Sequence, residues 1–148
     1  MKILILGIGN PILTDDAVGI LVVRQLNGVD ADVEEAATGG LAILDFIRGY
    51  DRVIIVDAVK RGTETRKGRS TRKRWKPGKV SVLKENEMKR ALHASSTHDL
   101  SFLEAVQLGR ALFPEEMPSE IIVIGIEVQD TETFSETPTD FVPVSYTH

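Results

Sequence analysis

The sequence predicts an α/β fold, a doubly wound three-layer sandwich in which a mostly parallel, twisted sheet of about five strands carries helices on both faces. Strand-like and helix-like segments alternate along the chain, which is typical of this class. Three of the strand-like segments are unbroken apolar runs, as expected for strands buried on both faces. A length of 148 residues predicts one domain, spanning residues 1–148.

Five segments are expected to form the sheet. KILIL at residues 2–6 is short, apolar and ended by glycine, and RVIIV at residues 52–56 is β-branched and unbroken. EIIVIGI at residues 120–126 is a further buried strand. DVEEAA at residues 32–37 is polar, so we expect it nearer an edge, and KVSVL at residues 79–83 alternates in polarity.

Three segments are expected to form helices, because their apolar residues recur at intervals of three and four. Residues 15–27 are followed by Gly28, and residues 40–48 by Gly49, as is common at helix ends. Residues 99–113 form the third predicted helix.

Composition excludes several classes of protein. The chain has no cysteine, which excludes disulfides, thiolate catalysis and cysteine-based metal sites. No apolar run approaches the roughly 18–20 residues of a membrane-spanning helix. The first residues lack a basic region followed by a long apolar one, so we expect no signal peptide. A cytoplasmic protein is the simplest interpretation.

Charge is distributed unevenly. Residues 60–79 hold 10 of the 18 Lys and Arg residues and a single acidic residue, Glu64, whereas the rest of the chain is strongly acidic. We expect an inserted basic loop over residues 60–78, which is either solvated or a contact for an acidic partner or nucleic acid. Trp75 is its only aromatic residue, so it offers no stacking platform for single strands.

Polar residues cluster where the predicted strands end. The first strand is followed by GIGNPILTDDAVG, residues 7–19, whose glycines indicate a tight turn or a close backbone approach. A dinucleotide turn would need a third glycine where Ile12 stands, which argues against a nucleotide site. Thr14 suits a helix N-cap, and acids are favourable in a first helical turn. Adjacent residues on a helix diverge by about 100°, so at most one of Asp15 and Asp16 can face a site.

Two further polar residues stand at element ends. Asp57 directly follows the apolar run VIIV, where an unpaired carboxylate would cost several kcal/mol. It is either a hydrogen-bonded strand terminus or a functional group. His98 precedes the third helix and is either a loop residue or a ligand. Two carboxylates and an imidazole above one sheet edge would suit a divalent transition metal such as nickel, zinc or iron.

The segments GIGNPILTDDAVG, VIIVDAV, SSTHDLSF and IVIGIE resemble, in order and spacing, the [NiFe]-hydrogenase maturation endopeptidases over roughly residues 1–59 and 79–128. The resemblance implies a peptidase that removes the C-terminal extension of the hydrogenase large-subunit precursor after nickel insertion. It implies no permanent cofactor: nickel presented by the substrate is recognised by Asp16, Asp57 and His98, which are also the expected catalytic residues. Thr38, Gly39 and Gly40 match a loop expected to contact the substrate.

Two features depart from that family. About fourteen extra residues, GTETRKGRSTRKRW, precede the turn before the fourth strand. Residues 129–148 are rich in Thr and Ser and form an expected irregular tail in place of the family's terminal helix. The alternative hypothesis is therefore a non-catalytic family member that binds the precursor or a metal without cleavage. We expect the precursor as partner, and neither membrane nor nucleic acid.

Overall fold

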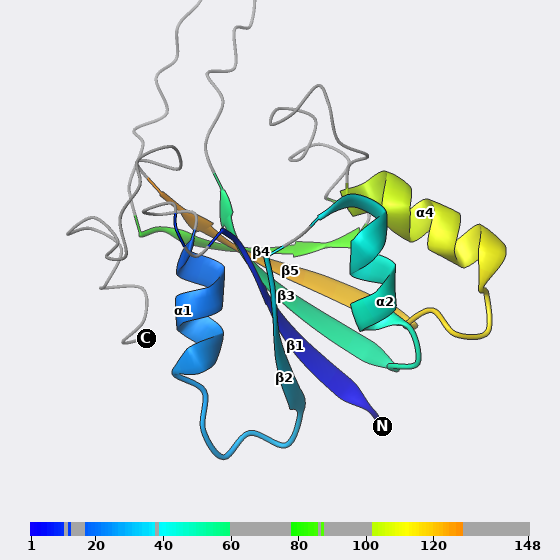
Figure 1. Ribbon diagram of the computed structural model, residues 1–148, viewed down its shortest axis with the longest axis horizontal. Helices are drawn as coiled ribbons and strands as arrows, with labels where there is room; N and C mark the ends of the chain where they lie inside the picture. The colour runs from blue at the N-terminus through cyan, green and yellow to red at the C-terminus, as the bar shows by residue number, and fades with distance from the viewer. Residues whose placement is uncertain are drawn as a thin grey trace, which may run out of the picture.

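The computed structural model describes residues 1–10, 12, 17–37, 39–59, 78–85, 87 and 102–128. They form a five-stranded sheet with helices on both faces, which confirms the predicted three-layer α/β sandwich (Figure 1). The elements, in chain order, are β1 (Ile3–Ile8), α1 (Val18–Arg24), β2 (Asp32–Ala36), the 3₁₀ turn η2 (Gly40–Ala42), α2 (Ile43–Ile47), β3 (Arg52–Val59), β4 (Val80–Lys84), α4 (Phe102–Leu112) and β5 (Glu120–Glu127).

The strand order is β2-β1-β3-β5-β4. Strands β2, β1, β3 and β5 run parallel, and β4 pairs antiparallel with β5 at the edge of the sheet. The chain leaves β1 in one direction, through α1 to β2, and then crosses back through α2 to β3 on the other side of β1. The winding direction therefore reverses between β1 and β3, and such a reversal point is where ligands bind in open α/β sheets.

Alternating side chains of the strands fill two separate cores. Val53 and Ile55 of β3 lie in the core under α2 and α4, whereas Val56 and Ala58 pack with residues of α1 on the opposite face. This period of two is the normal geometry of a strand, and both faces are apolar because both are covered by helices. Figure 1 shows α1 on one side of the sheet and the pair α2 and α4 on the other.

Several predicted boundaries differ from the structure. The described helix α1 begins at Val18 and ends at Arg24, three residues before its predicted end. Its last turn tightens because Gln25 N–H donates to Val22 O at 3.1 Å, a 3₁₀-type bond that closes the helix early. The predicted helix over residues 40–48 is divided into η2 and α2, and the described α4 ends at Leu112, one residue before its predicted end. The predicted starts of the first and third helices, at residues 15 and 99, lie outside the described residues.

Strand β3 continues to Val59, three residues beyond its predicted end. Pairing with β5 runs through to Val59↔Glu127 and holds this segment extended, although the pairing with β1 stops at Gly7↔Val56. The predicted basic loop over 60–78, except Gly78, and the tail over 129–148 lie outside the described residues. Within the part of the chain that the structure describes, no helix is long and apolar enough to cross a membrane.

Candidate functional site

The candidate site is the edge of the sheet at which the four parallel strands end (Figure 1). Gly9 N–H, just after β1, donates to Ala36 O at the end of β2, at 3.1 Å. On the other side, Gly78 N–H donates to Glu127 O at 2.8 Å, and Glu127 N–H donates to Lys79 O at 2.9 Å. Backbone hydrogen bonds therefore join the strand ends at both sides of this edge.

Helix α1 packs against this edge through its backbone. A Cβ atom added to Gly19 would lie 2.3 Å from Val56 O and 2.4 Å from Ile8 O, and one added to Gly7 would lie 2.5 Å from Gly19 O. Only glycine allows such an approach at these two positions. The first and last glycines of GIGNPILTDDAVG therefore fix the start of α1 directly over β1 and β3, beside the point where the winding reverses.

Asp57 lies inside β3 and not after it, which corrects the predicted position at a strand terminus. Its Cα pairs with Gly125 of β5, whereas the pairing of β3 with β1 ends one residue earlier, at Val56. By strand alternation its side chain shares the face of Val53 and Ile55, and it is partly buried. Asp57 thus stands at the reversal point between β1 and β3, as the prediction that it belongs to the site requires.

Glu127, the last residue of β5, was not predicted as a site residue. It is 8% exposed, and its Oε2 is buried and has no hydrogen-bond partner among the described residues. The sequence carried a signal for it: in EIIVIGIE an acidic residue ends an apolar run, as Asp57 does after VIIV.

The loop after β2 reaches the same edge. Gly40 has a φ of 58°, a left-handed conformation that favours glycine, and it opens the turn η2. Gly39 is exposed, and a Cβ there would meet nothing within 4 Å. The two glycines are therefore available at the predicted substrate-binding loop, whereas Thr38 lies outside the described residues.

The other predicted site residues, Asp16 and His98, also lie outside the described residues, as do Thr14 and Asp15. Ala17, which follows Asp16 in the chain, is the N-cap of α1 and is buried. Among the described residues, no three His, Cys, Asp or Glu side chains are grouped so that they could hold a metal ion. The predicted nickel-binding set of Asp16, Asp57 and His98 therefore stays a prediction.

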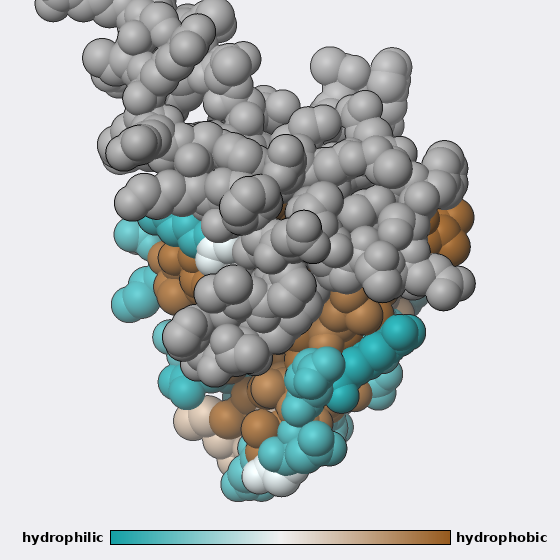
Figure 2. All heavy atoms as spheres, turned by 90° about the vertical axis from the view of Figure 1, so that its left-hand side faces the viewer, coloured by the Kyte–Doolittle hydropathy of each residue, from teal (hydrophilic) through white to brown (hydrophobic). Residues whose placement is uncertain are grey.

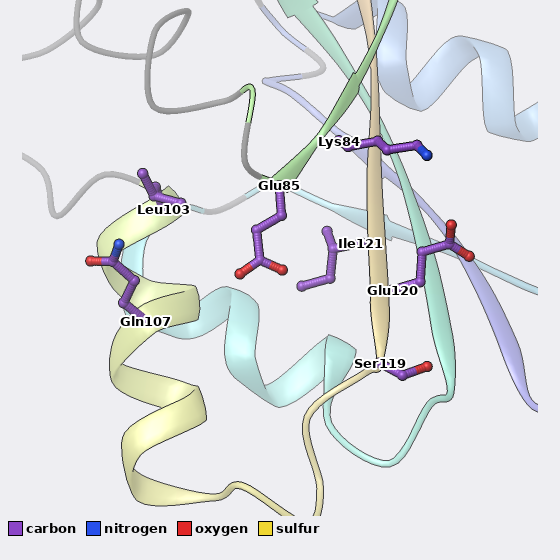
Figure 3. Close-up of a pocket in the computed structure, with 7 residues that line it drawn as sticks. All are labelled: Lys84, Glu85, Leu103, Gln107, Ser119, Glu120 and Ile121. Atoms are coloured by element: carbon purple, nitrogen blue, oxygen red, sulfur yellow. The ribbon is translucent and has the colours of Figure 1, made fainter.

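An open groove lies at the opposite end of β5, between α4 and the β4–β5 pair (Figure 3). This open groove of about 490 Å³ is lined by Lys84, Gln107, Glu120 and neighbouring residues. At this end of the sheet, Arg110 donates to both carboxylate oxygens of Glu85, at 3.0 and 2.5 Å, and to Pro118 O at 3.0 Å. The hydrogen bond to Glu85 raises the pKa of Arg110, and the pair fastens α4 to the sheet.

Comparison with known proteins gives one consistent result. Residues 20–140 match the family model described as hydrogenase maturation protease. The match includes Asp57, His98 and Glu127 but not the motif at residues 7–19, so it is independent of the strongest part of the motif resemblance.

The chain is similar to the hydrogenase 2 maturation protease of Escherichia coli (strain K12), with 27% identity over 139 residues, covering 89% of this chain and 76% of the relative. It is 28% identical over 138 residues to the hydrogenase expression/formation protein HupD of Rhizobium leguminosarum bv. viciae, covering 88% of this chain but only 61% of that protein. The solved structure of the hydrogenase maturating endopeptidase HybD from E. coli superposes with a TM-score of 0.75 at 25% identity, covering 99% of this chain and 86% of that one.

Proposed function

The chain belongs to the hydrogenase maturation protease family, and we propose that it is the endopeptidase that removes the C-terminal extension of a [NiFe]-hydrogenase large-subunit precursor after nickel insertion. The relatives support the reaction class, since they are named as maturation proteases and endopeptidases. The observation in this chain that carries the proposal is Asp57, a partly buried carboxylate at the reversal point of a sheet with that family's fold.

Nickel is assigned to the substrate and not to the enzyme, so we propose no permanent cofactor. Asp57 would contact the nickel ion that the precursor presents, together with Asp16 and His98. Carboxylate and imidazole are suitable ligands for nickel. A metal ion at this point polarises the scissile carbonyl or an attacking water. Asp16 or Asp57 would accept the proton from that water, and the proposal leaves the choice between them open.

The architecture supports the role of Asp57 in a specific way. The contact of Gly19 with Val56 O and Ile8 O holds α1 against β1 and against β3 one residue before Asp57. Residues 17 and 18, which directly follow Asp16, are buried at this contact. Asp16 precedes these two buried residues in the sequence.

A processing assay tests the proposal. The purified chain is mixed with a nickel-loaded large-subunit precursor and, as the matched control, with the same precursor lacking nickel. Loss of the C-terminal extension is followed by mass spectrometry. We expect cleavage of the nickel-loaded form alone. Equal cleavage of both forms would overturn nickel dependence, and cleavage of neither would overturn the peptidase assignment.

The second candidate function is that of a non-catalytic family member that binds the precursor without cutting it. The observation that favours it is the basic segment at residues 60–79, which contains the fourteen extra residues and offers charge for an acidic partner. This function differs from the peptidase function in one result: the chain would bind the nickel-loaded precursor, but the mass of the precursor would stay unchanged after prolonged incubation.

The partner in either case is the large-subunit precursor. Nucleic acid is not the proposed partner, and any binding of it through residues 60–79 would show a steep dependence on salt concentration. A cytoplasmic place of action stays a prediction from the cysteine-free composition.

A further inference from the structure

The side chain of Glu127 is a buried carboxyl group with an unsatisfied oxygen. The residue is 8% exposed, and Oε2 is shielded from solvent without a hydrogen-bond donor. Leaving a buried acceptor without its partner destabilises a protein, and more so if the group is charged. An apolar side chain of similar size would avoid this loss. A carboxyl group that persists here needs an explanation other than the stability of the sheet.

Glu127 shares a face of the sheet with Asp57. Val59 pairs with Glu127 and Asp57 pairs with Gly125, so the two acidic residues stand two positions apart on neighbouring parallel strands and have the same orientation. Strand geometry separates their Cα atoms by roughly 8 Å, which is short enough for both side chains to contact one ligand. Gly125 lies between them on β5 and carries no side chain, so nothing from this position fills the space beside Asp57.

Three described arginines form ion pairs away from Glu127. Arg52 pairs with Glu120 and Arg110 pairs with Glu85, both at the opposite end of the sheet, and Arg24 pairs with Glu35 on β2. Among the described residues, glutamates in other places have a charged partner, whereas Oε2 of Glu127 has none. A ligand that binds at this edge is a source of the missing donor.

We propose that Glu127 is a substrate-binding residue, whose Oε2 accepts a hydrogen bond from an N–H donor of the precursor's C-terminal segment while that segment lies beside Asp57. This inference rests on the proposed function. The donor is either a cationic side chain or a peptide N–H of the substrate, and both supply the same missing hydrogen bond. A cationic donor would contribute more to binding than a peptide N–H, because charge-assisted hydrogen bonds are stronger.

The test measures two quantities, precursor binding and thermal stability, for Glu127→Leu and Glu127→Gln. Glu120→Gln is the matched control, because it removes a glutamate from the other end of the same strand. The probe is the nickel-loaded large-subunit precursor that retains its extension. Its dissociation constant is measured for each full-length variant, and the melting temperature of each variant is measured alone.

We expect Glu127→Leu to weaken precursor binding by about tenfold or more, the value of one hydrogen bond to a charged group. Its melting temperature should stay the same or rise, because a buried unsatisfied oxygen is removed. Glu127→Gln distinguishes the two donors: a cationic donor predicts a loss close to that of the Leu variant, and a peptide N–H predicts binding within about threefold of wild type. The control should bind as wild type does.

Two results would overturn the inference. Binding by Glu127→Leu within about twofold of wild type would show that no substrate donor uses the group. A melting temperature clearly lower in both Glu127 variants than in the control would show a structural role. If the wild-type chain binds the precursor without cutting it, the proposed peptidase function fails, and the binding comparison still tests Glu127. If the wild-type chain does not bind the precursor, both proposals fail.

Discussion

Acidic residues at the amino ends of β3 and β5 have charged or hydrogen-bonding partners, whereas an oxygen of one acidic residue at the carboxyl end of β5 lacks a partner among the described residues. At the amino end of β3 and β5, Arg48 Nη2 lies 2.6 Å from Glu116 Oε2, Arg52 pairs with Glu120, and Asp51 accepts a hydrogen bond from Lys2 N–H at 2.5 Å. At the carboxyl end of β5, Glu127 is buried and its Oε2 has no donor in the part of the chain that the structure describes. Both ends belong to the same strands, so strand pairing does not explain the difference.

The difference indicates a division of tasks between the two ends. Paired charges at the amino end hold the α4 and β5 connections in place. They contribute to the stability of the fold and not to the binding of a ligand. An acceptor left open at the carboxyl end lowers stability and is useful only to a ligand. Substitutions at the two ends should therefore change different measured properties, and four of them test this expectation.

The largest effect is expected for Asp57→Ala at the carboxyl end. Loss of a metal-contacting or proton-accepting carboxylate should lower the processing rate by about a hundredfold to ten-thousandfold, while the melting temperature changes little. The rate is measured with the nickel-loaded precursor. Asp51→Ala, just before the same strand, is the control and should process normally with a modest loss of stability. Normal processing by a folded Asp57→Ala variant would contradict the assignment.

Gly19→Ala should show the next largest effect, on stability. The added Cβ would lie 2.3 Å from Val56 O and 2.4 Å from Ile8 O, so α1 must move away from the sheet. Overpacking of this kind costs about 2–3 kcal/mol of unfolding free energy, measured by urea denaturation. Gly39→Ala, where a Cβ meets nothing within 4 Å, should leave stability unchanged. Equal stability of the two variants would refute the close-packing argument.

Arg110→Met, at the amino end, should lower stability and leave processing unchanged, which is the opposite of the effect expected for Asp57→Ala. It removes the hydrogen bonds to Glu85 and to Pro118 O but keeps the apolar stem of the side chain. We expect a loss of about 1 kcal/mol in unfolding free energy, with the processing rate at 25 °C unchanged. A rate that falls together with stability would mean that the two ends are not independent.

The smallest effect concerns Glu35, a paired glutamate near the carboxyl end. The hydrogen bond from Arg24, at 2.8 Å, lowers the pKa of Glu35, and both side chains are exposed. A lowered folded-state pKa means that the pair contributes stability above the ordinary pKa of a glutamate and loses it as the pH falls through the lowered value. Glu35→Gln should therefore melt at nearly the wild-type temperature at pH 7, and the small difference should vanish in high salt. A large change at pH 7 would show that exposure does not weaken this pair.

The sheet could be predicted because its signals are local. The apolar runs before Gly7 and before Asp57 form buried parallel strands, and β4 alternates as an edge strand does. The extension of β3 to Val59 could not be predicted, because it depends on pairing with β5, far away in the sequence. The contact of Gly19 with two strands likewise could not be predicted, because it joins segments that are separate in the sequence.

The site could be predicted only in part. Asp57 was recognised because one carboxylate after an apolar run is conspicuous in a sequence. Glu127 follows a similar run, but its significance lies in a missing donor, which only a three-dimensional arrangement reveals. Asp16 and His98 remain predictions, because the structure does not describe them.

The pairing of β3 with β5 also bears on the order of folding. It joins residues 68 positions apart, so a long loop must close before Asp57 and Glu127 become neighbours. Distant parallel pairings form slowly, whereas β1, α1 and β3 are closer along the chain. We expect β5 to dock late, so substitutions such as Ile121→Val should accelerate unfolding more than they slow refolding in stopped-flow experiments. The chain would then acquire the acidic pair at its binding edge only in the final stage of folding, after the rest of the parallel sheet has formed.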